Sequence, residues 1–241
     1  MEEFNPYFYL KTGLGRANKL LDILPSNTQH EFPPLDEKNI HLLKTGTTTV
    51  GLVAQDGVVL ATESKVTAGH VIMSTRGPKI VQVTPTIAVT IAGGVSDCQH
   101  LINLIKAHIK IRELEWRRPA LTREVASILS NAMFNQRWYP YYSMLLLGGY
   151  DRKLPAYEGG PGLYMIDPLG SLIEEKVVAT GSGSVFAYGV LESRYHENVK
   201  IDEAVEIAKS AIKAAAKRDI YSGGGMQLAK ITDAGVELTV E

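Results

Sequence analysis

The pattern of hydrophobic and polar positions changes at residue 47, where β-branched and apolar residues begin to dominate. Runs typical of strands cover Thr47–Ala54 and Val58–Glu63. Gln55-Asp56-Gly57 lies between them and carries the Asp-Gly pair of a tight hairpin turn. Two further strands are predicted over residues 80–83 and 87–92. This part of the chain is therefore predicted to form β-hairpins.

Helical spacing replaces the strand pattern after Gly93-Gly94. A long helix is predicted to start near Ser96 or Asp97, either of which can cap it, and to end before Pro119. A second helix is predicted over about Thr122–Arg137. No strand is expected between the two helices, so we expect them to form an antiparallel hairpin.

The remainder of the chain repeats this order of strands followed by two helices. The predicted strands are 143–148, 162–166, 171–178, 226–231 and 236–240, and the predicted helices are 184–195 and 202–217, the latter capped by Asp202. Strands do not alternate one for one with helices, which argues against a doubly wound parallel sheet. The order favours two sheets packed together with pairs of helices outside.

Residues 1–46 have a different character. The stretch is interrupted by prolines and glycines, and its Gly13-Leu14-Gly15 lacks the preceding strand and third glycine of a nucleotide-binding loop. We expect at most a short helix around Arg16–Ile23. The stretch is predicted to be a poorly packed extension, either a flexible tail or a removable pro-segment, before a domain over residues 47–241.

Composition narrows the class of protein. With 241 residues, 45% of them hydrophobic, the chain can bury a sizeable core. A net charge of −1 gives no indication of a nucleic-acid or membrane-surface partner. Cys98 is the single cysteine, so no internal disulfide forms. Without a secretory signal or an apolar run of about 20 residues, the protein is predicted to be soluble and cytoplasmic.

Most sequence signatures of enzymes are missing. There is no Gly-x-x-x-x-Gly-Lys-Ser/Thr loop, no Gly-x-Ser-x-Gly elbow and no His-Glu-x-x-His. His100 and His108 share a predicted helix but lie two turns apart, so no metal site is expected. Cys98 lies in the same apolar helix and is expected to be an inert core thiol.

The remaining candidate is the stretch Gly46-Thr47-Thr48-Thr49, for which the residues alone leave two interpretations. Threonine favours strands, so the three threonines are explained as the start of a strand. Alternatively, cleavage after Gly46 would make Thr47 a new N-terminus. Its α-amine, which ordinarily has a pKa of about 7.7–8.0 against about 10.4 for lysine, could then serve as the base for its own hydroxyl.

A resemblance to a known family favours the second interpretation. Sequence blocks recur in order from Thr47 to the C-terminus: Gly46-Thr47-Thr48-Thr49-Val50-Gly51, Ala61-Thr62-Glu63-Ser64-Lys65-Val66-Thr67, Gly77-Pro78-Lys79, Thr90-Ile91-Ala92-Gly93, Ala179-Thr180-Gly181-Ser182-Gly183-Ser184, Tyr188-Gly189-Val190-Leu191-Glu192 and Lys217-Arg218-Asp219-Ile220-Tyr221-Ser222-Gly223-Gly224. In these blocks the chain resembles the catalytic β-subunits of the proteasome core particle, of the archaeal type. The resemblance implies an α+β fold: a four-layer αββα sandwich of two antiparallel sheets.

The resemblance also implies a role for each matched position. Thr47 would be the nucleophile of a threonine endopeptidase, freed by autocatalytic cleavage between Gly46 and Thr47, which removes residues 1–46 as a propeptide. Lys79 would favour the neutral amine and the ionised hydroxyl, and Glu63 would hold that lysine charged. The backbone N–H of Gly93 would bind the developing oxyanion. The polar support around the amine would come from Ser182, Asp219 and Ser222, beside a Tyr221 that stands where such subunits often have glycine.

The resemblance extends to substrate and partners. The pocket that selects the cleaved residue would be lined by Val66, Val81, Ile91, Val95 and Gln99, which favours hydrophobic or neutral residues. We expect β-subunits in seven-membered rings, proteasome α-subunit rings, an ATP-dependent unfoldase and polypeptide substrates, with no cofactor and no metal. Two alternatives remain: an unprocessed structural β-subunit of the same particle, and a stand-alone N-terminal-nucleophile amidohydrolase acting on small amides.

Overall fold

The structure is a computed structural model that describes residues 46–154 and 157–241. The predicted extension and its short helix around residues 16–23 therefore lie outside the described residues. Twelve strands and four helices are found in the described part of the chain. No helix there has the length and apolar character that crossing a membrane requires.

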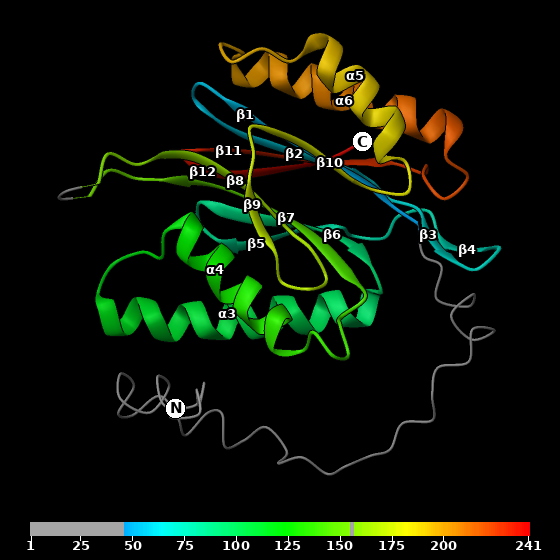
Figure 1. Ribbon diagram of the computed structural model, residues 1–241. Helices are drawn as coiled ribbons and strands as arrows, with labels where there is room; N and C mark the ends of the chain where they lie inside the picture. The colour runs from blue at the N-terminus through cyan, green and yellow to red at the C-terminus, as the bar shows by residue number, and fades with distance from the viewer. Residues whose placement is uncertain (1–45, 155–156) are drawn as a thin grey trace, which may run out of the picture. The chain divides into compact units, whose positions relative to one another are not determined.

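Two five-stranded antiparallel sheets form the centre of the fold (Figure 1). The first sheet has the order β10 (Val177–Gly181), β1 (Thr48–Ala54), β2 (Gly57–Glu63), β11 (Met226–Thr232) and β12 (Gly235–Val240). The second has the order β5 (Ile80–Thr84), β6 (Ile87–Gly93), β7 (Ser143–Asp151), β8 (Gly160–Ile166) and β9 (Leu172–Glu174). A separate hairpin pairs β3 (Val66–Ala68) with β4 (Val71–Ser74).

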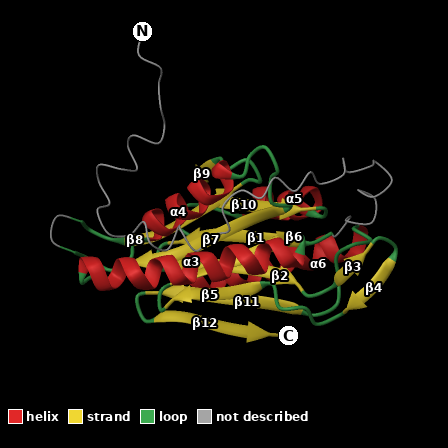
Figure 2. Ribbon diagram, turned by 90° about the horizontal axis from the view of Figure 1, so that it is seen from below, coloured by secondary structure: helices red, strands yellow, loops and turns green. Residues whose placement is uncertain are grey.

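Each sheet is covered on its outer face by a pair of helices (Figure 1). Helices α5 (Ser184–Arg194) and α6 (Ile201–Arg218) cover the first sheet, and α3 (Val95–Trp116) and α4 (Thr122–Asn135) cover the second. Figure 2 shows the second helix pair from its outer side. The four-layer αββα sandwich implied by the resemblance is confirmed.

Three hydrophobic cores separate the four layers. One lies between the first sheet and α5–α6, and another between the second sheet and α3–α4. The third lies between the two sheets and is built from β-branched and leucine side chains such as Val58, Leu60, Leu146 and Leu163. Most side chains on both faces of the central strands are therefore buried, which explains why β2 and β6 are nearly continuous apolar runs.

One predicted strand is wrong. Residues 171–178 form two strands that belong to different sheets, β9 and β10. The crossing occurs between adjacent residues: the N–H of Glu175 donates to the carbonyl of Leu163 in β8, whereas the carbonyl of Lys176 accepts from Val53 in β1. Glu174, Glu175 and Lys176 are exposed charged residues, which suit this passage between the sheets.

The predicted helix caps are also wrong. Helix α3 begins at Val95 with Gly94 as its N-cap, and α6 begins at Ile201 with Lys200 as its N-cap; neither cap forms a side-chain hydrogen bond. For α6, the carboxylate of Asp56 in the β1–β2 turn accepts the N–H of Ile201 at 3.0 Å. A residue distant in sequence therefore satisfies one of the free N–H groups at the helix start. The β3–β4 hairpin is a further element that was not predicted.

The core between the sheets provides a test of this packing. Leu146→Ala removes a fully buried side chain from that core and is expected to lower the free energy of unfolding by about 2–5 kcal/mol. The matched control is Leu238→Ala on β12, where the side chain is 49% exposed and the expected loss is within about 1 kcal/mol. Urea denaturation measures both. Equal losses would contradict the assignment of Leu146 to a tightly packed core.

Candidate active site

The residues for which the sequence predicts a catalytic role are brought together at one end of the two sheets. Thr47 immediately precedes β1, Glu63 ends the neighbouring antiparallel strand β2, and Ser182 follows β10 on the other side of β1. From the second sheet, Lys79 immediately precedes β5 and Gly93 ends β6. In an antiparallel sheet, the start of one strand lies beside the end of its neighbour. These positions therefore lie at the same end of each sheet.

Thr47, Lys79 and Glu63 form a buried chain of polar contacts. The Lys79 ammonium donates to Thr47 Oγ1 at 2.8 Å and forms an ion pair with Glu63 Oε1. Its third hydrogen bond goes to the carbonyl oxygen of Lys65 at 2.5 Å. Thr47, Glu63 and Lys79 are only 6%, 1% and 5% exposed. The hydroxyl of Thr47 is therefore held against a cation that is shielded from water.

Burial opposes charge on both partners of this ion pair. Loss of hydration lowers the pKa of Lys79 below the ordinary lysine value, although the charge of Glu63 acts in the opposite direction. Loss of hydration also raises the pKa of Glu63, against the effect of Lys79. Two backbone N–H groups, of Lys65 at 2.6 Å and Gly223 at 3.2 Å, donate to Glu63 Oε2 and favour its ionised form.

The Thr47 hydroxyl lies beside the peptide bond that precedes it. Thr47 Oγ1 donates to the carbonyl oxygen of Gly46 at 2.7 Å while it accepts from Lys79. Gly46 and Thr47 are joined in this structure, so the nitrogen of Thr47 is an amide and offers no basic lone pair. Lys79 is thus the titratable group bonded to this hydroxyl in the uncleaved chain.

A second polar network surrounds Asp219, which caps the C-terminal end of α6. Asp219 Oδ2 accepts from Ser182 Oγ at 2.6 Å and from Ser222 Oγ at 2.5 Å. Ser222 Oγ also lies 2.6 Å from Thr48 Oγ1. Because Ser222 gives its hydrogen to the carboxylate, Thr48 must be the donor in that last contact. The network thus joins three predicted residues to the start of β1.

Gly93 has a backbone conformation that favours glycine. Its φ is +125°, and a Cβ at this position would lie 2.2 Å from the carbonyl oxygen of Tyr142. Gly93 and Thr47 face one cavity of about 550 Å³. The other lining residues are Ala92, Tyr142, Ser143, Met144, Met165, Pro168, Ala179, Thr180, Gly181, Ser182 and Ser184. Space for a ligand therefore lies beside Thr47.

The five expected pocket residues do not line this cavity, as far as the described residues show. Val81 and Ile91 pack in the core under α3 and α4. Val66 begins β3, while Val95 and Gln99 are exposed on the first two turns of α3. Ile91 is nevertheless adjacent to the site, since its N–H donates to the carbonyl oxygen of Lys79. Their role in selecting substrate remains a prediction.

Two residues of the site were not predicted. Gln227 in β11 accepts the N–H groups of Lys79 and Ile80 at 2.8 and 3.2 Å and donates to the carbonyl of Gly77 at 2.8 Å. Lys65 donates to the carbonyls of residues 220 and 222. Gln227 gave little signal in the sequence, because β11 also contains the polar residues Lys230 and Thr232.

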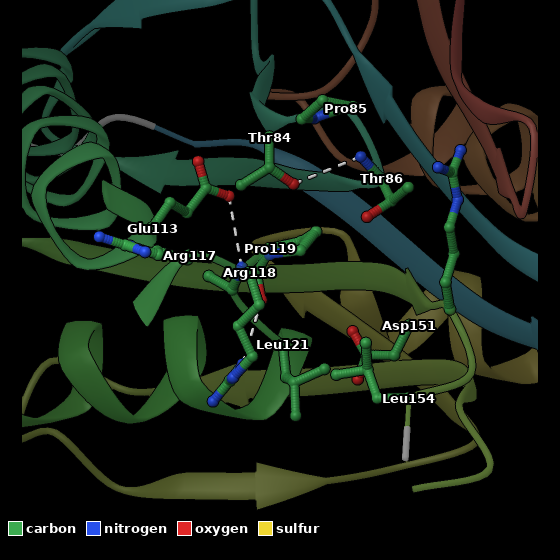
Figure 3. A pocket seen from close by; sticks show the side chains of 12 residues that line it. Thr84, Pro85, Thr86, Glu113, Arg117, Arg118, Pro119, Leu121, Asp151 and Leu154 are labelled. Atoms are coloured by element: carbon green, nitrogen blue, oxygen red, sulfur yellow. Dashed lines mark hydrogen bonds between the residues drawn. The ribbon is translucent and has the colours of Figure 1, made fainter. Parts of the chain in front are cut away.

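A second cavity of about 360 Å³ lies between the β5–β6 turn, the α3–α4 connection and the end of β7 (Figure 3). Its lining includes none of the predicted site residues. Several of its polar groups are bonded to each other or to neighbours: Glu113 accepts from the N–H of Ala120, and Asp151 accepts from Thr122 and Tyr157. These bonds leave Glu113 and Asp151 poorly available to a ligand.

Cys98 is a buried thiol. Its Sγ lies 3.2 Å from Ser143 Oγ, and burial raises its pKa, so its reactive thiolate is disfavoured. In residues 46–154 and 157–241 there is no cluster of three or more His, Cys, Asp or Glu side chains placed to hold a metal ion.

Comparison with known proteins identifies the family. The family described as "Proteasome subunit" matches residues 43–231. The proteasome subunit beta of Ferroglobus placidus is 48% identical over 198 residues, which covers 81% of this chain and 91% of that protein. The corresponding protein of Archaeoglobus profundus is 47% identical over 191 residues, covering 79% and 86%. Proteasome subunit beta 2 of Aeropyrum pernix is 42% identical over 203 residues, covering 84% and 88%. The chain belongs to the proteasome family and is a β-type subunit.

Proposed function

We propose that this subunit is a threonine endopeptidase whose nucleophile is the hydroxyl of Thr47. The observation that carries the proposal is the buried contact of Thr47 Oγ1 with the Lys79 ammonium at 2.8 Å, together with the ion pair of Lys79 with Glu63. A nearby positive charge lowers the energy of an ionised hydroxyl. An ordinary strand threonine has no need of such a partner.

The first substrate of this hydroxyl would be the chain itself. Thr47 Oγ1 would attack the carbonyl carbon of Gly46, and the Gly46–Thr47 amide would become an ester with a free amine on Thr47. Water would then hydrolyse the ester, releasing the preceding segment with a C-terminal carboxylate. The 2.7 Å hydrogen bond between Thr47 Oγ1 and the carbonyl oxygen of Gly46 supports this step, because it places the hydroxyl beside the carbonyl that it attacks.

After this cleavage, the freed α-amine of Thr47 would act as the base. A terminal amine ordinarily has a pKa of about 7.7–8.0, which leaves a useful fraction neutral at physiological pH, and the positive charge of Lys79 would increase that fraction. The amine would take the hydroxyl proton as the oxygen attacks a substrate carbonyl, and water would hydrolyse the resulting acyl-enzyme. The N–H of Gly93 would stabilise the oxyanion, a contribution of about 2.7–4 kcal/mol for one donor. Ser182, Asp219 and Ser222 would orient the amine.

The subunit would work in the cytoplasm inside a particle of β-subunit and α-subunit rings, seven subunits to a ring, on polypeptides unfolded by an ATP-dependent partner. Exposed apolar side chains support assembly. Val71, Ile72 and Met73 on β4 are consecutive and 55–67% exposed. Several large apolar side chains exposed on one hairpin are typical of protein–protein contacts.

The nucleophile can be tested by substitution. Thr47→Ala removes the hydroxyl, so we expect no detectable peptide hydrolysis and no cleavage after Gly46, with the fold retained. The matched control is Thr49→Ala in the same segment, which breaks only the 2.7 Å contact with Thr180 Oγ1. This control should cost about 1 kcal/mol of stability and keep the activity. Wild-type turnover by Thr47→Ala would rule out the proposed nucleophile.

The ion pair can be tested through the pH dependence of hydrolysis. Glu63→Gln removes the charge that opposes desolvation of Lys79, so the pKa of Lys79 falls further. Lysine loses its charge as the pH rises through its pKa, so the alkaline limb of the pH–activity profile should shift to lower pH. The substitution should also lower the free energy of unfolding by about 3–5 kcal/mol.

The matched control is Glu124→Gln, which breaks the partly exposed ion pair with Arg118. It should change the free energy of unfolding by at most about 1 kcal/mol and leave the pH profile unchanged. An unshifted alkaline limb in Glu63→Gln would show that the charge of Lys79 is not needed.

Processing and assembly can be tested together by mass measurement. The intact mass of the purified particle should show a chain that begins at Thr47, and its native mass should be that of a large ring assembly. Assembled particles with an uncleaved chain would instead support the structural subunit. A small active species would support the stand-alone amidohydrolase.

A further inference from the structure

Gly46 is in close contact with the side chain of Tyr221. A Cβ at position 46 would stand 1.9 Å from Tyr221 Cβ, 2.5 Å from Tyr221 Cγ and 2.8 Å from Ser182 Oγ. Contacts between non-bonded carbon atoms normally begin near about 3.5 Å, so the space beside Gly46 admits a hydrogen atom but no methyl group. Any other residue at position 46 requires the surroundings to move.

Rotation of the tyrosine side chain cannot relieve this contact. The position of a Cβ atom is set by the backbone and does not change with χ1. The backbone around Tyr221 is fastened at several points: its N–H donates to Asp219 Oδ1 at 3.2 Å, and the Lys65 ammonium donates to the carbonyls of Ile220 at 3.2 Å and Ser222 at 2.8 Å. Alanine at position 46 would therefore have to displace its own backbone.

Displacement of residue 46 would move its carbonyl group relative to the Thr47 hydroxyl. The carbonyl oxygen of Gly46 accepts the Thr47 hydroxyl at 2.7 Å, and the N–H of Gly46 lies 3.4 Å from Thr67 Oγ1. Tyr221 and Ser182 bound Gly46 on the side where a Cβ would stand. Together these contacts hold the carbonyl of Gly46 against the hydroxyl that would attack it.

We propose that Tyr221 is a positioning residue for self-cleavage, which restricts residue 46 to glycine and keeps its carbonyl beside the Thr47 hydroxyl. The proposal rests on the proposed function, since it assigns the residue that selects the chain's own scissile bond. The atoms nearest to a Cβ added at position 46 come from Tyr221 and Ser182 and not from the five residues expected to choose substrate side chains. Selection for self-cleavage is therefore separate from selection among substrates.

A double-substitution experiment tests the contact. The rate at which chains beginning at Thr47 appear is followed by intact mass for wild type, Gly46→Ala, Tyr221→Gly and the double variant. Gly46→Ala should slow cleavage at least about tenfold, as expected for overpacking of a tight site. The double variant should recover to within about threefold of Tyr221→Gly alone. Cleavage in the double variant as slow as in Gly46→Ala would overturn the proposal.

Tyr221→Ala is the matched control. It removes the ring but keeps the Cβ that lies 1.9 Å from the position of a Cβ on residue 46. With Gly46 intact, the self-cleavage rate of this variant is the reference for its combination with Gly46→Ala. Combined with Gly46→Ala it should remain slow. Equal rescue by Tyr221→Ala and Tyr221→Gly would contradict the Cβ contact as the cause.

A second measurement keeps this proposal distinct from the proposed function. In a Thr47→Ala background, where no cleavage occurs, hydrogen exchange reports how firmly the segment around residue 46 is held. Gly46→Ala should increase exchange at residues 47–49, and Tyr221→Gly should reverse that increase. An uncleaved wild-type chain would contradict self-cleavage, and hydrogen exchange would then decide the role of Tyr221. That role would be overturned if Gly46→Ala did not increase exchange at residues 47–49, or if Tyr221→Gly did not reverse the increase.

Discussion

The candidate active site depends on one buried ion pair between the two sheets. Glu63 ends a strand of the first sheet and Lys79 precedes a strand of the second. Burying two charges is expensive unless their remaining hydrogen-bonding capacity is used. Here the three hydrogens of the Lys79 ammonium go to Glu63, Thr47 and the carbonyl of Lys65. The same contacts that neutralise the buried charge also hold the Thr47 hydroxyl.

Close approach of the two sheets makes this ion pair possible. Gly51 in β1 lies under Leu163 of the opposite sheet, where an added Cβ would be 2.7 Å from Leu163 Cδ1. A Cβ added to Gly148 in β7 would likewise lie 2.8 Å from Val58 Cγ1. Larger residues at either position would press the sheets apart. Because Glu63 and Lys79 belong to different sheets, packing far from the chemistry determines the distance between them.

The loop after α6 is held against the site by a second set of hydrogen bonds. Asp219 accepts two serine hydroxyls and the N–H of Tyr221, and Ser222 is hydrogen-bonded to Thr48, which ties this loop to the start of β1. The loop also reaches Glu63 through the N–H of Gly223. The polar network and the ion pair are thus joined, and the Gly46–Thr47 bond lies between them. Under the proposed function, the bond to be cleaved is therefore held by the same residues that would act on substrates.

The sequence by itself determined most elements, because hydrophobic periodicity is a local property of strands and helices. It also identified the junction at Thr47 and, through blocks resembling a known family, the residues that meet there. Only the tertiary structure decided that residues 171–178 cross between sheets, that Asp56 binds the start of α6, and that Gln227 holds the backbone of Lys79. Periodicity shows which face of an element is buried. It does not show which distant backbone group lies opposite, and that choice depends on the packing of the whole domain.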